Sequence, residues 1–328
     1  MPFGRLAKWS FTLAVSAVAV LAVGCASTQE AIPDLRIPRP GGPVPQVTYS
    51  WQVSSQTVSA IPKEMPVYKF VAKNLDEQDF KSLASQFGMS GAIERDEDQS
   101  SFLMTDGEKR LSMNWETGKW SYGDYSKLYS SNNTNIPSDD EVARIATEYL
   151  KEKGWLPDDF RLQSVEAVTE QNAADITAPP RIIGKVAYFY RYIGDWPVLG
   201  VSRIVVHVGD NGEIVGVKKL FKDIEPAGNM SLKSVDQAFA ELRAGDAVLS
   251  TDNPNVKQAA VQDVHLAYWE DAGSISDQPY LQPVYVFTAK ATEGAADTFS
   301  AIVPAIQGVA LKPLDAVEDP TTVPAARP

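Results

Sequence analysis

The sequence predicts an α+β protein made of repeated units, each with one amphipathic helix packed on an antiparallel sheet. Two observations lead to this prediction. A helix-capping pattern followed by an apolar stripe at helical spacing occurs at three places in the chain. Each of these segments has neighbouring short apolar runs bounded by turn residues, which are typical of antiparallel strands. An apolar stripe on one face only favours a helix that lies on a sheet over a helix inside a bundle.

The three helices are expected where a capping residue is followed three positions later by an acidic or amide residue. These patterns begin at Asn74, Ser138 and Ser234. The apolar stripes are Phe80, Leu83, Ala84 and Phe87 in the first helix, Val142, Ile145, Ala146 and Tyr149 in the second, and Val235, Ala238, Phe239 and Leu242 in the third. Gly88, Gly154 and Gly245 are expected to end them, since glycine readily adopts the left-handed conformation of a helix C-terminus.

Strands are expected around each helix. Their ranges are 66–72, 101–105, 109–114 and 119–122 in the first unit, 162–170, 185–193, 203–208 and 213–221 in the second, and 260–270, 283–289 and 298–303 in the third. Gly209-Asp210-Asn211-Gly212 predicts a hairpin turn, because asparagine and glycine tolerate a positive φ. The expected units are therefore residues 47–130, 131–228 and 229–311.

Residues 1–24 predict an export signal. Arg5 and Lys8 are followed by an uncharged run, 11–23, that is shorter than the roughly 20 residues needed to span a bilayer. Leu21-Ala22-Val23-Gly24-Cys25 resembles the bacterial lipobox, in which the cysteine is diacylated and the preceding peptide bond is cut. It departs from the commonest pattern because Leu21 lies one position early. The alternatives are a plain secretory signal and an uncleaved anchor.

The lipobox interpretation places the protein at the cell membrane, anchored through lipid on Cys25 on the extracytoplasmic face, which is the periplasmic side if there are two membranes. Cys25 is the only cysteine, so a disulfide framework is not expected. Residues 25–46 are rich in proline and predict an extended tether, and residues 312–328 predict a disordered tail.

The second unit resembles the PepSY domain of peptidase propeptides and envelope regulators. The resemblance is carried by Ser138 and the helix after it, by Tyr188, and by the hairpin Val205-Val206-His207-Val208-Gly209-Asp210-Asn211-Gly212-Glu213-Ile214. Residues 188–198 also look like the YycI and YycH regulators, which restrain a membrane sensor kinase. Residues 280–287 resemble lipoproteins with paired PepSY-like halves, so the third unit is expected to be PepSY-like too. YycI and YycH keep a transmembrane helix where this chain has a lipobox.

Few residues indicate catalysis, and an enzyme is not expected. His207 and His265 each lie in a predicted strand and belong to no metal-binding spacing, so no metal or other cofactor is expected. No glycine-rich phosphate loop or nucleophile elbow is present. The formal net charge of −12 argues against binding nucleic acid. A pair of catalytic carboxylates is left open, because only their distance in space reveals one.

Aromatic residues form the most distinctive pattern. Tyr188, Tyr190 and Tyr192 alternate along one predicted strand and share a face, and Trp196 follows in a turn. These side chains either pack within the sheet or form an exposed strip that binds a partner, since Tyr and Trp are frequent at interface hot spots.

The function expected from these observations is that of a non-enzymatic, lipid-anchored envelope protein. It would bind and regulate a membrane or exported protein, as a modulator of a sensor kinase or a peptidase does. The alternative is a carrier or scaffold for a small molecule or cell-wall polymer. An exposed aromatic strip or open sheet edge would favour the first, and a closed apolar pocket the second.

Overall fold

The computed structural model describes residues 31–39, 45–128, 130, 132–171, 177–293 and 297–314. The described residues from 33 onward form one compact unit, to which all the elements below belong. The expected signal peptide, Cys25 and most of the expected tail lie outside the described residues. Within those residues, no helix has the length and apolar character needed to cross a membrane.

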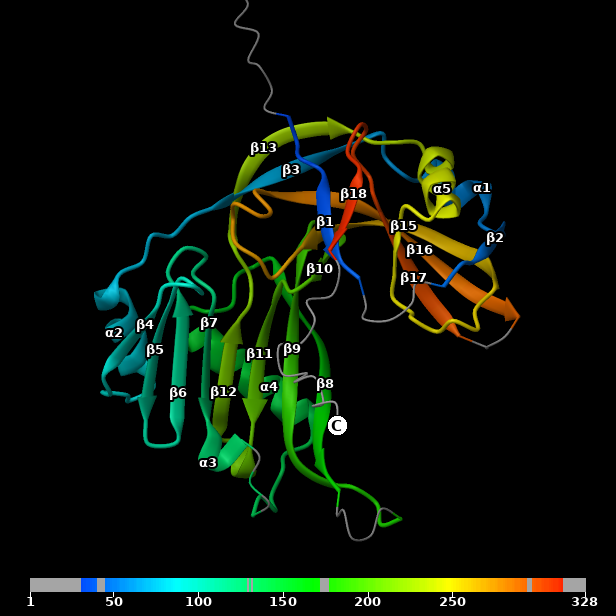
Figure 1. The fold of residues 1–328 in the computed structure, drawn as a ribbon. Coiled ribbons are helices and arrows are strands. Elements are labelled where there is room, and N and C mark those ends of the chain that lie inside the picture. The colour runs from blue at the N-terminus through cyan, green and yellow to red at the C-terminus, as the bar shows by residue number, and fades with distance from the viewer. Residues whose placement is uncertain are drawn as a thin grey trace, which may run out of the picture. The chain divides into compact units, whose positions relative to one another are not determined.

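The predicted fold class is wrong. Strands make up 48% of the structure and helices 17%, and the described residues contain five α-helices beside one large mixed sheet. The error lies in sheet pairing, because strands from different expected units pair directly with one another. The sheet is therefore continuous, and no helix packs on a separate sheet of its own (Figure 1).

One half of the sheet is entirely antiparallel, and we call it the α4 region. Its strands, in spatial order, are β4 (Ile93–Asp96), β5 (Ser101–Asp106), β6 (Lys109–Asn114), β7 (Trp120–Asp124), β12 (Ile214–Lys219), β11 (Arg203–Val208), β9 (Arg181–Ile193) and β8 (Phe160–Glu170). Helices α2 (Glu77–Gln86) and α4 (Asp139–Glu152) contribute to a single buried core on one face. The short helix α3 (Tyr125–Leu128) contacts β6, β7 and β12.

The β7–β12 ladder joins what the sequence predicted as two units. Val217 pairs with Tyr122, and both side chains are buried in the same core. Gly216 pairs with Gly123, and the side chain of Leu128 lies 3.2 Å from where a Cβ on Gly216 would be. Glycine at position 216 thus gives α3 the space to approach the sheet closely.

The rest of the sheet, together with α1 (Ser55–Ser59) and α5 (Val235–Ala244), forms what we call the α5 region. Its strands are β2 (Thr48–Trp51), β3 (Glu64–Val71), β13 (Asp223–Ser231), β14 (Val248–Leu249), β15 (Gln258–Glu270), β16 (Tyr280–Glu293) and β17 (Thr298–Pro304). The sequence placed β3 with the first helix, whereas β3 pairs with β13 and β16 here. A second hydrophobic core lies in this region.

Two short pairings link distant parts of the chain. β10 (Trp196–Gly200) pairs antiparallel with β9 and parallel with β15, so it connects the two regions. β1 (Leu35–Pro38) pairs in parallel with β18 (Leu311–Leu314). Part of the segment expected as a tether is thus a strand in the structure, and it lies beside the last described residues.

The predicted helix signals are mostly confirmed. Ser138 and Ser234 cap α4 and α5, accepting hydrogen bonds from the backbone N–H groups of Glu141 and Gln237. The first cap is shifted, because Asp76 and not Asn74 caps α2 and forms a capping box with Asp79. The turn at 209–212 is also confirmed: Asn211 adopts φ 56° in the connection between β11 and β12.

Candidate functional site

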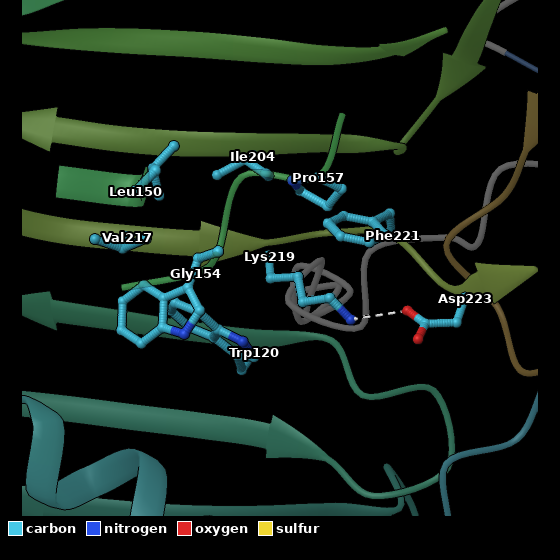
Figure 2. A pocket seen from close by; sticks show the side chains of 10 residues that line it. Trp120, Leu150, Gly154, Pro157, Ile204, Val217, Lys219, Phe221 and Asp223 are labelled. Carbon is cyan, nitrogen blue, oxygen red and sulfur yellow. Dashed lines mark hydrogen bonds and ion pairs between the residues drawn. The ribbon is translucent and has the colours of Figure 1, made fainter. Parts of the chain in front are cut away.

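A half-open pocket of about 230 Å³ lies in the α4 region, on the face of the sheet that carries α4. Figure 2 shows the side chains that surround it. The lining comes from β7, β11, β12, the end of α4 and the loop after it, and from the β12–β13 connection with the first residue of β13: Trp120, Leu150, Gly154, Trp155, Pro157, Ile204, Val217, Lys219, Phe221 and Asp223. The lining is mainly apolar, and Lys219 and Asp223 are its only ionisable side chains.

Two tryptophans form the aromatic wall of this pocket. The ring of Trp120 lies 4.8 Å from that of Trp155 in an edge-to-face arrangement, which suits the charge distribution of aromatic rings. Gly154 adopts φ 68° just after α4, and the N–H of Trp155 donates to the carbonyl of Leu150. This helix-ending turn directs Trp155 back over the sheet. Phe87 packs against both indoles and supports them from α2.

An ion pair borders the pocket. Lys219 Nζ lies 3.4 Å from Asp223 Oδ1, donates to the Gly118 carbonyl at 3.3 Å, and stands 4.4 Å from the centre of the Phe221 ring. The other carboxylate oxygen of Asp223 pairs with Lys73. Figure 2 shows the Lys219 side chain reaching Asp223 beside the aromatic rings.

The environment tunes the charges of this pair. Burial lowers the pKa of Lys219, and the charge of Asp223 opposes that effect. Burial on its own would raise the pKa of Asp223, but the hydrogen bond from Lys73 and the charge of Lys219 outweigh it, so the net effect is a lowered pKa. The carboxylate is therefore ionised at neutral pH, shared between two lysines.

A second cluster of charges is buried close by, where the α4 and α5 regions meet. Glu270 Oε1 accepts a hydrogen bond of 2.8 Å from the backbone N–H of Lys222. Lys222 Nζ lies 3.3 Å from the Asp271 carbonyl and 4.6 Å from the centre of the Phe70 ring. Lys119 Nζ donates to the same carbonyl at 3.4 Å, and burial lowers the pKa of Lys119 to about 8.

The tyrosines proposed from the sequence lie elsewhere. Phe189 is buried in the α4-region core, so Tyr188, Tyr190 and Tyr192, which alternate with it, point to the opposite face and are half-buried there. Tyr192 donates to Gln163 at 3.0 Å. The guanidinium groups of Arg161 and Arg203 lie over the rings of Tyr192 and Tyr190, at 4.6 and 5.7 Å. Partner binding at these tyrosines stays a prediction.

Trp196 is also separate from the pocket, because it packs half-buried against the core of the α5 region. Sequence reasoning missed Trp120, Trp155 and Lys219. The signal for them was the Gly154-Trp155-Leu156-Pro157 sequence directly after a predicted helix, where a large apolar side chain follows a helix-ending glycine.

The two histidines have different environments. His207 is half-buried in β11, and His265 is exposed in β15, 3.2 Å from Asp263. Among the described residues, no group of three or more His, Cys, Asp or Glu side chains is arranged to hold a metal ion.

Comparisons with known proteins find a distant structural neighbour. No family model matches the chain, and no curated protein matches it significantly. A solved structure, the Bacillus megaterium YpeB C-terminal domain, aligns over 73% of this chain and 97% of its own, with 16% identity and a TM-score of 0.34. At this TM-score the likeness carries no conclusion about function.

Proposed function

We propose that this chain is a non-enzymatic, lipid-anchored envelope protein that binds a membrane or exported protein by holding one apolar side chain of that partner in the Trp120–Trp155 pocket. The observation that carries the proposal is the size and lining of the pocket. Its volume of about 230 Å³ is below the roughly 300–1,000 Å³ of sites for small molecules. Aromatic walls supported by a core are typical of pockets that accept an anchor residue at an interface.

The chemistry of the lining also favours binding over catalysis. Its two ionisable groups, Lys219 and Asp223, are paired with each other. No hydroxyl or thiol group lies in the lining beside them to act as a nucleophile. The same apolar lining also supports the alternative function of a carrier. A small molecule bound in the pocket of the isolated protein would indicate that function.

The envelope part of the proposal rests on the lipobox-like sequence that ends at Cys25. Labelling of cells with a fatty-acid probe tests it. The wild-type protein should take up the label and Cys25→Ala should not. Equal labelling of both proteins would contradict a lipid anchor at this residue.

Selection of peptides from a random displayed library tests the pocket. We expect enriched peptides to share one large apolar residue and to bind Trp155→Ala at least about tenfold more weakly, because the variant removes one wall of the pocket. Val217→Phe places an aromatic ring inside the pocket, where it should compete with the apolar residue of the peptide and weaken binding. Tyr125→Ala is the matched control, since Tyr125 is an exposed aromatic residue outside the pocket.

The controls decide between the outcomes. Each variant is compared only after its urea midpoint shows that it is folded. Enriched peptides that bind Trp155→Ala and Val217→Phe as tightly as the wild type would show that the pocket is not the site. If mass spectrometry of the intact protein finds a small molecule that both pocket variants release, the carrier function replaces the proposal.

A further inference from the structure

We propose that the segment held by this pocket is acidic: a carboxylate beside its apolar anchor residue binds to the ammonium groups of Lys73 and Lys219. This inference rests on the proposed function and specifies the chemistry of the partner at the same site.

The first argument is the balance of charge at the edge of the pocket. Lys73 and Lys219 share one carboxylate, that of Asp223, which leaves one positive charge in excess. The whole chain has a formal net charge of −12, so a local excess of lysine runs against its overall character. Such a position attracts an anionic group in preference to a cationic one.

Two neighbouring sets of charges are balanced within themselves. Arg191, whose guanidinium lies 5.6 Å from the centre of the Phe221 ring, is paired with Asp159 at 2.7 Å. In the adjacent buried cluster, Lys119 and Lys222 face Glu270 and Asp271, which gives equal numbers of cations and acids. Burial raises the pKa of Glu270 and lowers that of Lys119, so it weakens charges of both signs in that cluster.

The second argument concerns the position of Asp223. Its two oxygens each contact one lysine, the arrangement that a ligand carboxylate would adopt between the same two groups. Lys73 and Asp223 have side chains that are 35% and 36% exposed, so an arriving carboxylate can reach the pair from solvent. Lys219 is more buried, at 20%, and its ammonium group lies over the Phe221 ring, so this lysine stands between the apolar lining and the position of the ligand carboxylate.

Two matched peptides test the inference. Ac-Gly-Glu-Phe-Glu-Gly-NH₂ carries a carboxylate on either side of the anchor, and Ac-Gly-Gln-Phe-Gln-Gly-NH₂ keeps the shape without charge. Binding is followed by the fluorescence of the pocket tryptophans. We expect the acidic peptide to bind about three- to tenfold more tightly, and the advantage to shrink at high salt.

Substitutions in the protein distinguish binding at Lys73 and Lys219 from a general effect of the protein's charge. Lys73→Gln should reduce the advantage of the acidic peptide, whereas Lys81→Gln, the same charge change on the exposed side of α2, should not. Asp223→Asn should increase that advantage, because it removes the internal competitor and frees both lysines. Asp252→Asn is its matched control at an exposed site in the α5 region.

The outcomes separate this inference from the proposed function. If both peptides bind equally and Trp155→Ala weakens both, the apolar pocket is used but the partner is not selected for its acid. If Asp223→Asn and Asp252→Asn strengthen the acidic peptide to the same extent, long-range charge accounts for the effect and the Lys73–Lys219 site is wrong. If neither peptide binds while a library peptide with another anchor residue does, the same Glu-to-Gln comparison is made in that peptide. Equal binding of its acidic and neutral forms would contradict the inference.

Discussion

His207 shows how one residue makes stability depend on pH. Burial, with a further contribution from the charge of Lys218, lowers the pKa of His207 from 6.5 to about 4. Its Nε2 atom forms no hydrogen bond within the described part of the chain. Because the unfolded chain takes up a proton near pH 6.5 and the folded chain only near 4, stability should fall as the pH drops through this range.

We therefore expect His207→Gln to lose less stability than the wild type between these two pH values, by about 1–3 kcal/mol. Urea unfolding at a series of pH values measures the difference. His265→Gln is the control, because His265 is exposed on another strand and should follow the wild type. If both variants have the same pH dependence, the burial of His207 is not what makes acid destabilising.

At the scale of the element, the helix stripes predicted from sequence lie on the buried faces, but their members differ in depth. Leu242 in α5 is 2% exposed, whereas Ile145 in α4 is only half-buried. We expect Leu242→Ala to cost about 2–5 kcal/mol of unfolding free energy and Ile145→Ala about 1 kcal/mol, since the cost depends on how completely the cavity is enclosed. Denaturant melts measure both. A larger loss at Ile145 would mean that α4 packs with another face on the sheet.

The contrast between helices and strands shows what the sequence can predict. The caps at Ser138 and Ser234 and the turn at Asn211 depend on residues a few positions apart, so local reasoning identifies them. The partner of a strand depends on segments far away in sequence. Nothing local in β7 indicates that it pairs with β12. The pocket was missed for the same reason, because Trp120 comes from a strand and Trp155 from a helix end.

At the scale of the whole molecule, the two regions are joined by buried charges as well as by β10. Lys222 lies in the connection that leads from β12 to β13, is fully buried, and contacts Glu270 and Asp271 at the end of β15 in the α5 region. Buried ion pairs add little net stability over apolar packing, but removing one partner leaves a charge uncompensated. The cluster therefore depends on correct docking, because the acids come from the α5 region and their cations from the segments before β7 and after β12.

Lys222→Met is the direct test of this coupling. We expect it to cost about 3–5 kcal/mol, because the acids of the α5 region lose a buried cation. Adding Glu270→Gln should recover part of the loss, since it removes one of the uncompensated acids, whereas Glu270→Gln should recover nothing in a Leu242→Ala background. Calorimetry supplies a second readout: the wild type should unfold in one transition and Lys222→Met in two, as the α4 and α5 regions separate. A single transition with unchanged stability in Lys222→Met would show that β10 holds the regions together without the buried charges.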